Sequence, residues 1–153
     1  AKSTDSTAAA TGIPVESFKV YFPSALAQWT PSADGTRWVR TQDGKPHTDV
    51  VDGSQLSAKN IVVMQVHIDR KYGYVPKTTM VDSGKAWVFT EGKYIEATWS
   101  KASQTAPIVL TAADGATVQL ARGNTWVELV PMAPEGKLKI VEAKVTPSPT
   151  PTE

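Results

Sequence analysis

Hydrophobic and polar side chains alternate with a period of two through most of this chain. In residues 61–69, every second position from Val62 to Ile68 is apolar, and the other face turns polar at His67 and Asp69. Such alternation places successive side chains on opposite faces and is typical of a β-strand. We therefore predict short strands with minimal helix, and a strand at 61–69 that is buried at its start and emerges into solvent.

The clearest hairpin lies at residues 86–99, where two segments rich in aromatic and β-branched residues flank Glu91-Gly92. Glycine supplies the positive φ that a tight hairpin turn needs. A two-residue loop at this point places Phe89 opposite Tyr94. Both faces of the hairpin are apolar, so we expect it to be central in its sheet or covered on both sides.

Glycine preceded by a charged residue recurs between the alternating segments. Short strands divided by such turns indicate a mainly-β fold, which we predict to be a single antiparallel sandwich or small barrel-like domain. The turn pairs are Asp34-Gly35, Asp43-Gly44, Asp52-Gly53, Glu91-Gly92, Asp114-Gly115 and Arg122-Gly123.

The two ends of the chain differ in composition from its middle. Residues 1–12 are small and mostly polar, and residues 146–153 alternate Thr or Ser with Pro. Both lack the apolar surface that would offset the entropy of ordering, and Pro-rich stretches serve as extended spacers. We therefore predict a flexible tail at 1–12, a β domain at 13–145 and a Thr/Pro-rich linker or tail at 146–153.

Charge and cysteine content exclude several classes of function. The 153 residues include 16 basic and 15 acidic ones, for a net charge of +1, and no Lys/Arg cluster is present to bind nucleic acid. The absence of cysteine excludes disulfides, thiolate zinc sites and cysteine nucleophiles. No apolar run approaches the roughly 20 residues that span a bilayer. Nothing in the composition indicates a cofactor, and none is predicted.

Several segments follow one another in the order and approximate spacing of a known family. They are RTQDGKPHTD at 40–49, LSAKNIVVMQV at 56–66, GKAWVFTEGKYIEATWSK at 84–101 and GNTWVELVP at 123–131. Trp29, followed by a spacer and then Trp38 and Arg40, matches the start of the same pattern. Together they resemble the C-terminal domain of the YerB-like lipoprotein family of bacteria, whose function is unknown. The resemblance covers residues 28–131.

The resemblance implies a location and supplies no catalytic residue. Members of this family look like exported, membrane-anchored lipoproteins with a larger N-terminal domain, which is not visible in this chain. We therefore expect an extracytoplasmic protein, membrane-anchored or at the cell surface, whose contact with the membrane is made through an anchor outside this chain.

The segment 40–49 carries the densest group of polar side chains. Arg40, Asp43, Lys45, His47 and Asp49 are candidates to line a pocket for an anionic or sugar-like ligand. The alternative is a solvated β-turn at Asp43-Gly44, which is common wherever strands reverse.

Tryptophans and one asparagine complete the candidate ligand-binding residues. Trp29 and Trp38 flank a loop, so we expect their rings to be exposed and able to stack on a sugar, whereas Trp99 and Trp126 lie within alternating strands and are expected in the core. Asn60, before the longest apolar strand, either contacts a ligand or bonds to nearby backbone. The full candidate set is Trp29, Trp38, Arg40, Asp43, His47, Asp49 and Asn60.

A metal site is the alternative interpretation of two His-x-Asp pairs. On a strand, residues i and i+2 share a face, so His47 with Asp49 and His67 with Asp69 each present an imidazole and a carboxylate together. If the two pairs met, they would offer ligands suited to zinc or another divalent metal. Otherwise they are two surface histidines beside carboxylates.

These observations favour a non-catalytic binding or interaction module of an exported, envelope-associated lipoprotein. The expected partner is another envelope protein or the cell-wall glycan. The alternative is part of an envelope hydrolase or metal-assisted enzyme whose site is shared with the N-terminal domain of the family. No serine lies in a Gly-x-Ser-x-Gly elbow, and no catalytic residue is predicted.

Overall fold

A computed structural model describes residues 6–69, 77–79, 82–132 and 136–143. The predicted mainly-β class is confirmed, because strands dominate the described residues and the helix α1 (Thr7–Thr11) is short. The strands are β1 (Ile13–Tyr21), β2 (Leu26–Pro31), β3 (Trp38–Gln42), β4 (Lys45–Pro46), β5 (Ser57–Ala58), β6 (Asn60–Asp69), β7 (Lys77–Thr79), β8 (Asp82–Thr90), β9 (Lys93–Lys101), β10 (Val109–Ala112), β11 (Thr125–Pro131) and β12 (Lys137–Glu142).

The strands form one open, mixed sheet with the order β11-β6-β8-β9-β1-β2-β3-β4. Off this path, β10 pairs with β9, β12 with β1, β5 with β3 and β7 with β6. Every pairing among the described strands is antiparallel except that of β11 with β6, which is parallel. The predicted antiparallel arrangement therefore holds apart from this one pair, and the sheet does not close into a barrel.

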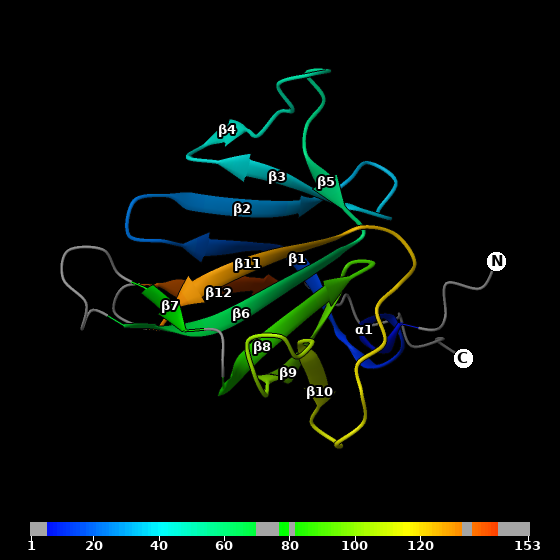
Figure 1. Cartoon of the computed structure of the whole chain (residues 1–153). Coiled ribbons are helices and arrows are strands. Elements are labelled where there is room, and N and C mark those ends of the chain that lie inside the picture. The colour runs from blue at the N-terminus through cyan, green and yellow to red at the C-terminus, as the bar shows by residue number, and fades with distance from the viewer. Residues whose placement is uncertain (1–5, 70–76, 80–81, 133–135, 144–153) are drawn as a thin grey trace, which may run out of the picture.

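The sheet folds into two layers because two runs of chain take part in both. At its start β1 pairs with β9 through Ile13 and Pro14, and beyond an irregularity at Val15/Ser17 it pairs with β12 and, from Phe18, with β2. The second run is formed by β5 and β6. The strand β5 pairs with β3 in one layer, and β6, which begins two residues after β5 ends, pairs with β8 in the other layer. Figure 1 shows β1, β2 and β3 side by side on one part of the molecule and β6, β8 and β9 on the other.

The inner faces of the two layers meet in an aromatic core. Phe18 of β1 stacks on Phe89 of β8 with ring centroids 3.6 Å apart, and Trp38 of β3 approaches both rings edge-on. Stacked and edge-on aromatic pairs stabilise a core beyond the area that they bury. These contacts fix how one layer sits on the other.

A second apolar cluster covers the opposite face of β6, β8 and β9. It contains Val88 and Trp99, which are buried beneath Val118 and the side chains of β10. The predicted hairpin at 86–99 thus has both faces covered, as its apolar character indicated.

The register of this hairpin also agrees with the sequence prediction, since Phe89 lies opposite Tyr94. Glu91 and Gly92 have φ angles of 52° and 77°, the pair of positive values that a tight two-residue turn requires. The glycine of every predicted turn pair has positive φ.

The N-terminal boundary differs from the prediction. Residues 6–12, expected in a flexible tail, lie on the body of the domain: Ser6 caps α1 and Ala8 is buried. The backbone N–H of Thr7 donates to the Gln119 carbonyl at 2.9 Å, and the Thr7 hydroxyl accepts from the Gln119 N–H at 2.8 Å. Small side chains allow this close packing, although they offer little apolar surface. The predicted linker at 146–153 lies outside the described residues.

Within the described part of the chain, no helix combines the length and apolar character that crossing a membrane requires.

Candidate functional site

A polar cluster joins the two layers in the interior, and Arg40 is its centre. Its Nε donates to Glu128 Oε1 at 2.9 Å, and the side chains of both residues are only 7% exposed. The same carboxylate oxygen accepts from the Trp29 indole N–H at 3.3 Å. Because β3 supplies Arg40 and β11 supplies Glu128, this buried ion pair ties strands that are distant in the sequence.

The imidazole of His47 completes the cluster in a defined tautomer. Arg40 Nη1 lies 2.6 Å from His47 Nδ1 and 2.7 Å from Gln42 Oε1. A guanidinium donates hydrogen bonds and never accepts them, so Nδ1 of His47 must be the acceptor and carries no proton. The remaining ring nitrogen, Nε2, then holds the proton of the neutral imidazole.

Aromatic rings enclose the guanidinium. Its carbon lies 5.8 Å from the Trp29 ring centroid and 5.3 Å from that of Trp126, within the range of cation–π attraction. Arg40 is thus held by hydrogen bonds to Glu128, Gln42 and His47 and by contacts with two indole rings. The arrangement locks the two layers together.

Glu128 and Trp126 were missed as members of this cluster. The signal was present in TWVELVP: Glu128 takes the inward position between Trp126 and Val130, and a carboxylate on an apolar face requires a buried partner. Nothing in the order of residues identifies Arg40 as that partner.

The predicted exposure of two tryptophans is wrong. Trp29 is 0% exposed and Trp38 is 1% exposed, so both rings belong to the core. Their position beside a loop suggested an open location, but the second layer covers them. Trp99 is buried, as expected, and Trp126 is half-buried against the core.

The other polar residues of 40–49 do not converge with Arg40 on a pocket. Asp43 sits in an exposed turn and accepts from the Leu26 N–H at 2.9 Å. Asp49 accepts from the Val51 N–H at 2.7 Å, and Lys45 is exposed. The alternative of a solvated turn therefore describes Asp43 and Lys45, while Arg40 and His47 are brought together.

The loop beyond β4 is a well-bonded turn with an apolar tip. Val50 and Val51 are fully exposed there. The segment between β4 and β5 projects from the body of the domain in Figure 1. The hydroxyl and N–H of Ser54 both donate to Asp52 and lower the pKa of that carboxyl. These bonds hold the turn in shape without forming a cavity.

The two His-x-Asp pairs lie far apart. The His47 ring contacts Trp126, which pairs with Ile61 near the start of β6, whereas His67 is exposed near the end of that strand. Positions 61 and 67 are separated by about 20 Å along a strand. No group of three His, Asp or Glu side chains that suits a metal ion occurs among the described residues.

Asn60 is buried, and its side chain joins separate segments of the chain through hydrogen bonds. Its Nδ2 donates to the Ala121 carbonyl at 2.8 Å, and its Oδ1 accepts from the Thr90 hydroxyl at 2.8 Å and the Ala121 N–H at 3.0 Å. The side chain is 0% exposed. Asn60 therefore fastens the segment around Ala121 to β6 and β8 and is closed to a ligand.

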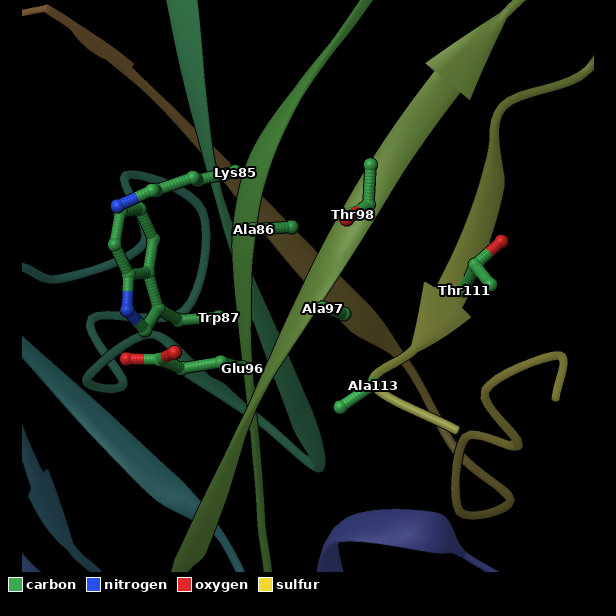
Figure 2. Close-up of a pocket in the computed structure, with 8 residues that line it drawn as sticks. All are labelled: Lys85, Ala86, Trp87, Glu96, Ala97, Thr98, Thr111 and Ala113. Atoms are coloured by element: carbon green, nitrogen blue, oxygen red, sulfur yellow. The ribbon is translucent and has the colours of Figure 1, made fainter. Parts of the chain in front are cut away.

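A shallow groove crosses the outer face of β8 and β9. In Figure 2, Ala86, Ala97 and Ala113 face a cavity of about 200 Å³, while the side chains of Trp87 and Glu96 lie on the opposite side of the ribbon. Thr98 and Thr111 also line the groove, so it presents methyl groups together with hydroxyl-bearing side chains.

A larger cavity of about 570 Å³ adjoins this groove between α1, β9 and β10. It is lined in part by Ile13, Ile95 and Tyr94. Burial, followed by the hydrogen bond to Glu142, raises the pKa of the Tyr94 hydroxyl. A protonated phenol bound to a carboxylate offers no reactive group to this cavity.

The strand β11 ends the sheet, and among the described residues no strand pairs with the other side of its backbone. Met132 donates its N–H to the Val66 carbonyl on β6, and the Asn124 carbonyl accepts from β6 as well. In a parallel pair, alternate residues bond to the neighbouring strand, so Trp126, Glu128 and Val130 do so too. The N–H and C=O groups of Thr125, Val127 and Leu129 point away from β6, and we call them the β11 edge.

Apolar side chains accompany the β11 edge. Val127 is 46% exposed and Leu129 is 36% exposed, and both project from the same face of the strand. They lie beside Val62 and Met64 of β6, which are buried. The apolar outer face of the sheet thus continues to its open edge.

Comparison with solved structures finds a protein of similar fold. The structure resembles the crystal structure of YerB protein from Bacillus subtilis with a TM-score of 0.67 and 22% sequence identity. The match covers 84% of this chain and 45% of that one, so the chain spans less than half of that protein. No curated protein matches the sequence.

A family model assigns the sequence more directly. The model described as "Protein of unknown function (DUF3048) C-terminal domain" matches residues 18–127. This range contains Asn60, the members of the Arg40 cluster other than Glu128, and Thr125 and Val127 of the β11 edge. The predicted resemblance to the YerB-like family is confirmed, and the chain belongs to the family of DUF3048 C-terminal domains.

Proposed function

We propose that this domain is a non-catalytic binding module of an exported, envelope-associated bacterial lipoprotein, and that its partner is another envelope protein. The observation that carries the proposal is the β11 edge with its exposed apolar side chains. An extended segment of the partner adds to the sheet as a further strand beside β11.

An open strand edge supplies both parts of such an interaction. Its unpaired N–H and C=O groups bond to any extended backbone, and the side chains beside them select the partner. Here Val127 and Leu129 favour apolar side chains at alternate positions of the added strand. The apolar surface around them adds the hydrophobic contribution to binding.

A cell-wall glycan is a weaker candidate partner. Sugar binding uses exposed aromatic rings, and Trp29, Trp38 and Trp99 are all buried. The groove in Figure 2 is shallow, and alanine methyl groups make up part of its lining, alongside Thr98 and Thr111.

The enzymatic alternative has no support among the described residues. His47 and Glu128 are both bonded to Arg40, and His67 lies on the far part of β6. A general base must reach a substrate proton, which neither His47 nor Glu128 is free to do.

The proposal is tested by photocrosslinking in the cells that make the protein. A photoreactive phenylalanine derivative replaces Val127, and a matched variant carries it at Val109, which is also an exposed apolar strand residue. We expect irradiation to give a discrete adduct in the envelope fraction with the position 127 variant. Mass spectrometry then identifies the partner peptide.

Two outcomes would overturn the proposal. One is equal adduct formation at positions 109 and 127, or no adduct at either. The other is sedimentation of the purified domain with insoluble peptidoglycan, which would support the glycan as partner.

A further inference from the structure

We propose that two copies of this chain pair through their β11 edges, in an antiparallel ladder centred on Val127. The inference rests on the proposed function, since it takes the β11 edge as the contact surface and names a second copy as a partner.

The backbone pattern of β11 is self-complementary. In an antiparallel ladder, a hydrogen-bonded pair of residues exchanges both N–H···O=C bonds. With Val127 opposite Val127 of the second copy, Thr125 comes opposite Leu129. All three residues direct their backbone groups outward, so every pair in this ladder forms both bonds.

The end of the strand sets the length of the ladder. Pro131 also faces outward but has no N–H, and it falls opposite Gly123, beyond the strand. The pairing therefore covers Thr125 to Leu129 and stops. A contact of this length is small for a permanent complex, so we expect a dimer in reversible equilibrium with the monomer.

The side chains agree with the same register. Val127 lies beside its own copy across the two-fold axis, and cross-strand pairs of β-branched residues are favourable. Leu129 on each copy extends the apolar surface outward from Met64. The apolar outer faces of the two sheets thus become continuous across the axis.

No like charges oppose each other in this arrangement. Between Gly123 and Pro131, Glu128 is the charged residue, and its side chain points inward to Arg40. An inward carboxylate that is already paired adds no repulsion between copies. The electrostatic cost that usually keeps edge strands apart is therefore absent from this ladder.

Sedimentation velocity from micromolar to millimolar concentration tests the pairing. We expect the unaltered chain to shift from monomer to dimer as concentration rises. Val127→Lys places two ammonium groups side by side at the axis and should weaken the dimer at least about tenfold. Val109→Lys, the same change at another exposed apolar strand position, should leave the equilibrium unchanged. Circular dichroism confirms that both variants fold.

A single cysteine tests the register itself. The chain has no cysteine, so Val127→Cys introduces one thiol per copy. Residues opposite each other in a hydrogen-bonded antiparallel pair have Cα atoms about 5.5 Å apart, which suits a disulfide. Mild oxidation should crosslink Val127→Cys rapidly and Val109→Cys slowly.

The inference is overturned if the chain stays monomeric throughout, or if the two cysteine variants crosslink equally fast. These failures are separable from failure of the proposed function. A monomeric chain whose position 127 still crosslinks to a different envelope protein in cells retains the function and loses only the second copy as a partner.

Discussion

Arg40 Nε and Glu128 Oε1 meet 2.9 Å apart inside the domain, although 88 positions separate them in the sequence. One residue belongs to the layer that contains β2 and β3, and the other belongs to the strand that carries the open edge. The pair therefore holds β11 in place from its inner face, while the other side of its backbone remains available.

Removing one member of this pair should destabilise the domain more than removing both. Glu128→Leu leaves the guanidinium buried without a counter-charge, which costs about 3–5 kcal/mol. The double replacement Arg40→Met with Glu128→Leu should cost less than Glu128→Leu alone, because no buried charge is left unpaired. Urea unfolding of the four proteins of this cycle gives the coupling free energy. Single changes that cost under about 1 kcal/mol would mean that water solvates the pair.

The neutral imidazole of His47 should carry its proton on Nε2 in the folded domain. The donor at Arg40 requires a free lone pair on Nδ1. Nitrogen chemical shifts of the imidazole distinguish the two tautomers and the doubly protonated ring. His67, which is exposed, serves as the internal reference. A proton found on Nδ1 of His47 would contradict the arrangement of the cluster.

Asn60→Ala should loosen the segment around Ala121. The change leaves the Ala121 N–H and the Thr90 hydroxyl without a partner, and we expect a loss of about 2–4 kcal/mol in unfolding free energy. Thr90→Val removes a single bond to Asn60 and should cost only about 1 kcal/mol. Hydrogen exchange at Ala121 provides the local readout. Unchanged exchange there in Asn60→Ala would show that other contacts hold the segment.

The stability of the domain should fall at alkaline pH partly because of Tyr94. Burial, and then Glu142, raises the pKa of its hydroxyl in the folded state. The folded state therefore binds the proton more tightly, and the resulting stabilisation is complete below the ordinary value of about 10. It is lost as pH rises through the folded-state value.

Tyr94→Phe should accordingly flatten the loss of stability above about pH 10. Glu142→Gln, which removes the charge and keeps an acceptor oxygen, should reduce the effect only in part, since burial is the larger cause. Denaturant melts at a series of alkaline pH values measure both. An identical alkaline slope in the Phe variant would rule out this contribution.

Local features of the fold were predictable from the sequence, and long-range ones were not. The turn at Glu91-Gly92 and the pairing of Phe89 with Tyr94 follow from glycine chemistry and alternation within a few residues. The parallel pairing of β11 with β6 joins distant segments, and nothing in either segment specifies the other.

The candidate site shows the same division. Arg40 and His47 were both identified from the polar segment that contains them, and the structure does bring them together. Trp29 was placed on the surface because sequence shows its neighbours along the chain and hides the layer that packs over it. Glu128, which lies on that covering layer, is the residue whose role only the tertiary structure reveals.

The most direct measurement on the central claim is hydrogen exchange of individual β11 amides in the isolated domain at low concentration. We predict alternation: Trp126, Glu128 and Val130 exchange slowly because they bond to β6, and Thr125, Val127 and Leu129 exchange fast. Slow exchange at Val127 and Leu129, equal to that at Glu128, would mean that the chain itself already covers this edge, and it would contradict the account.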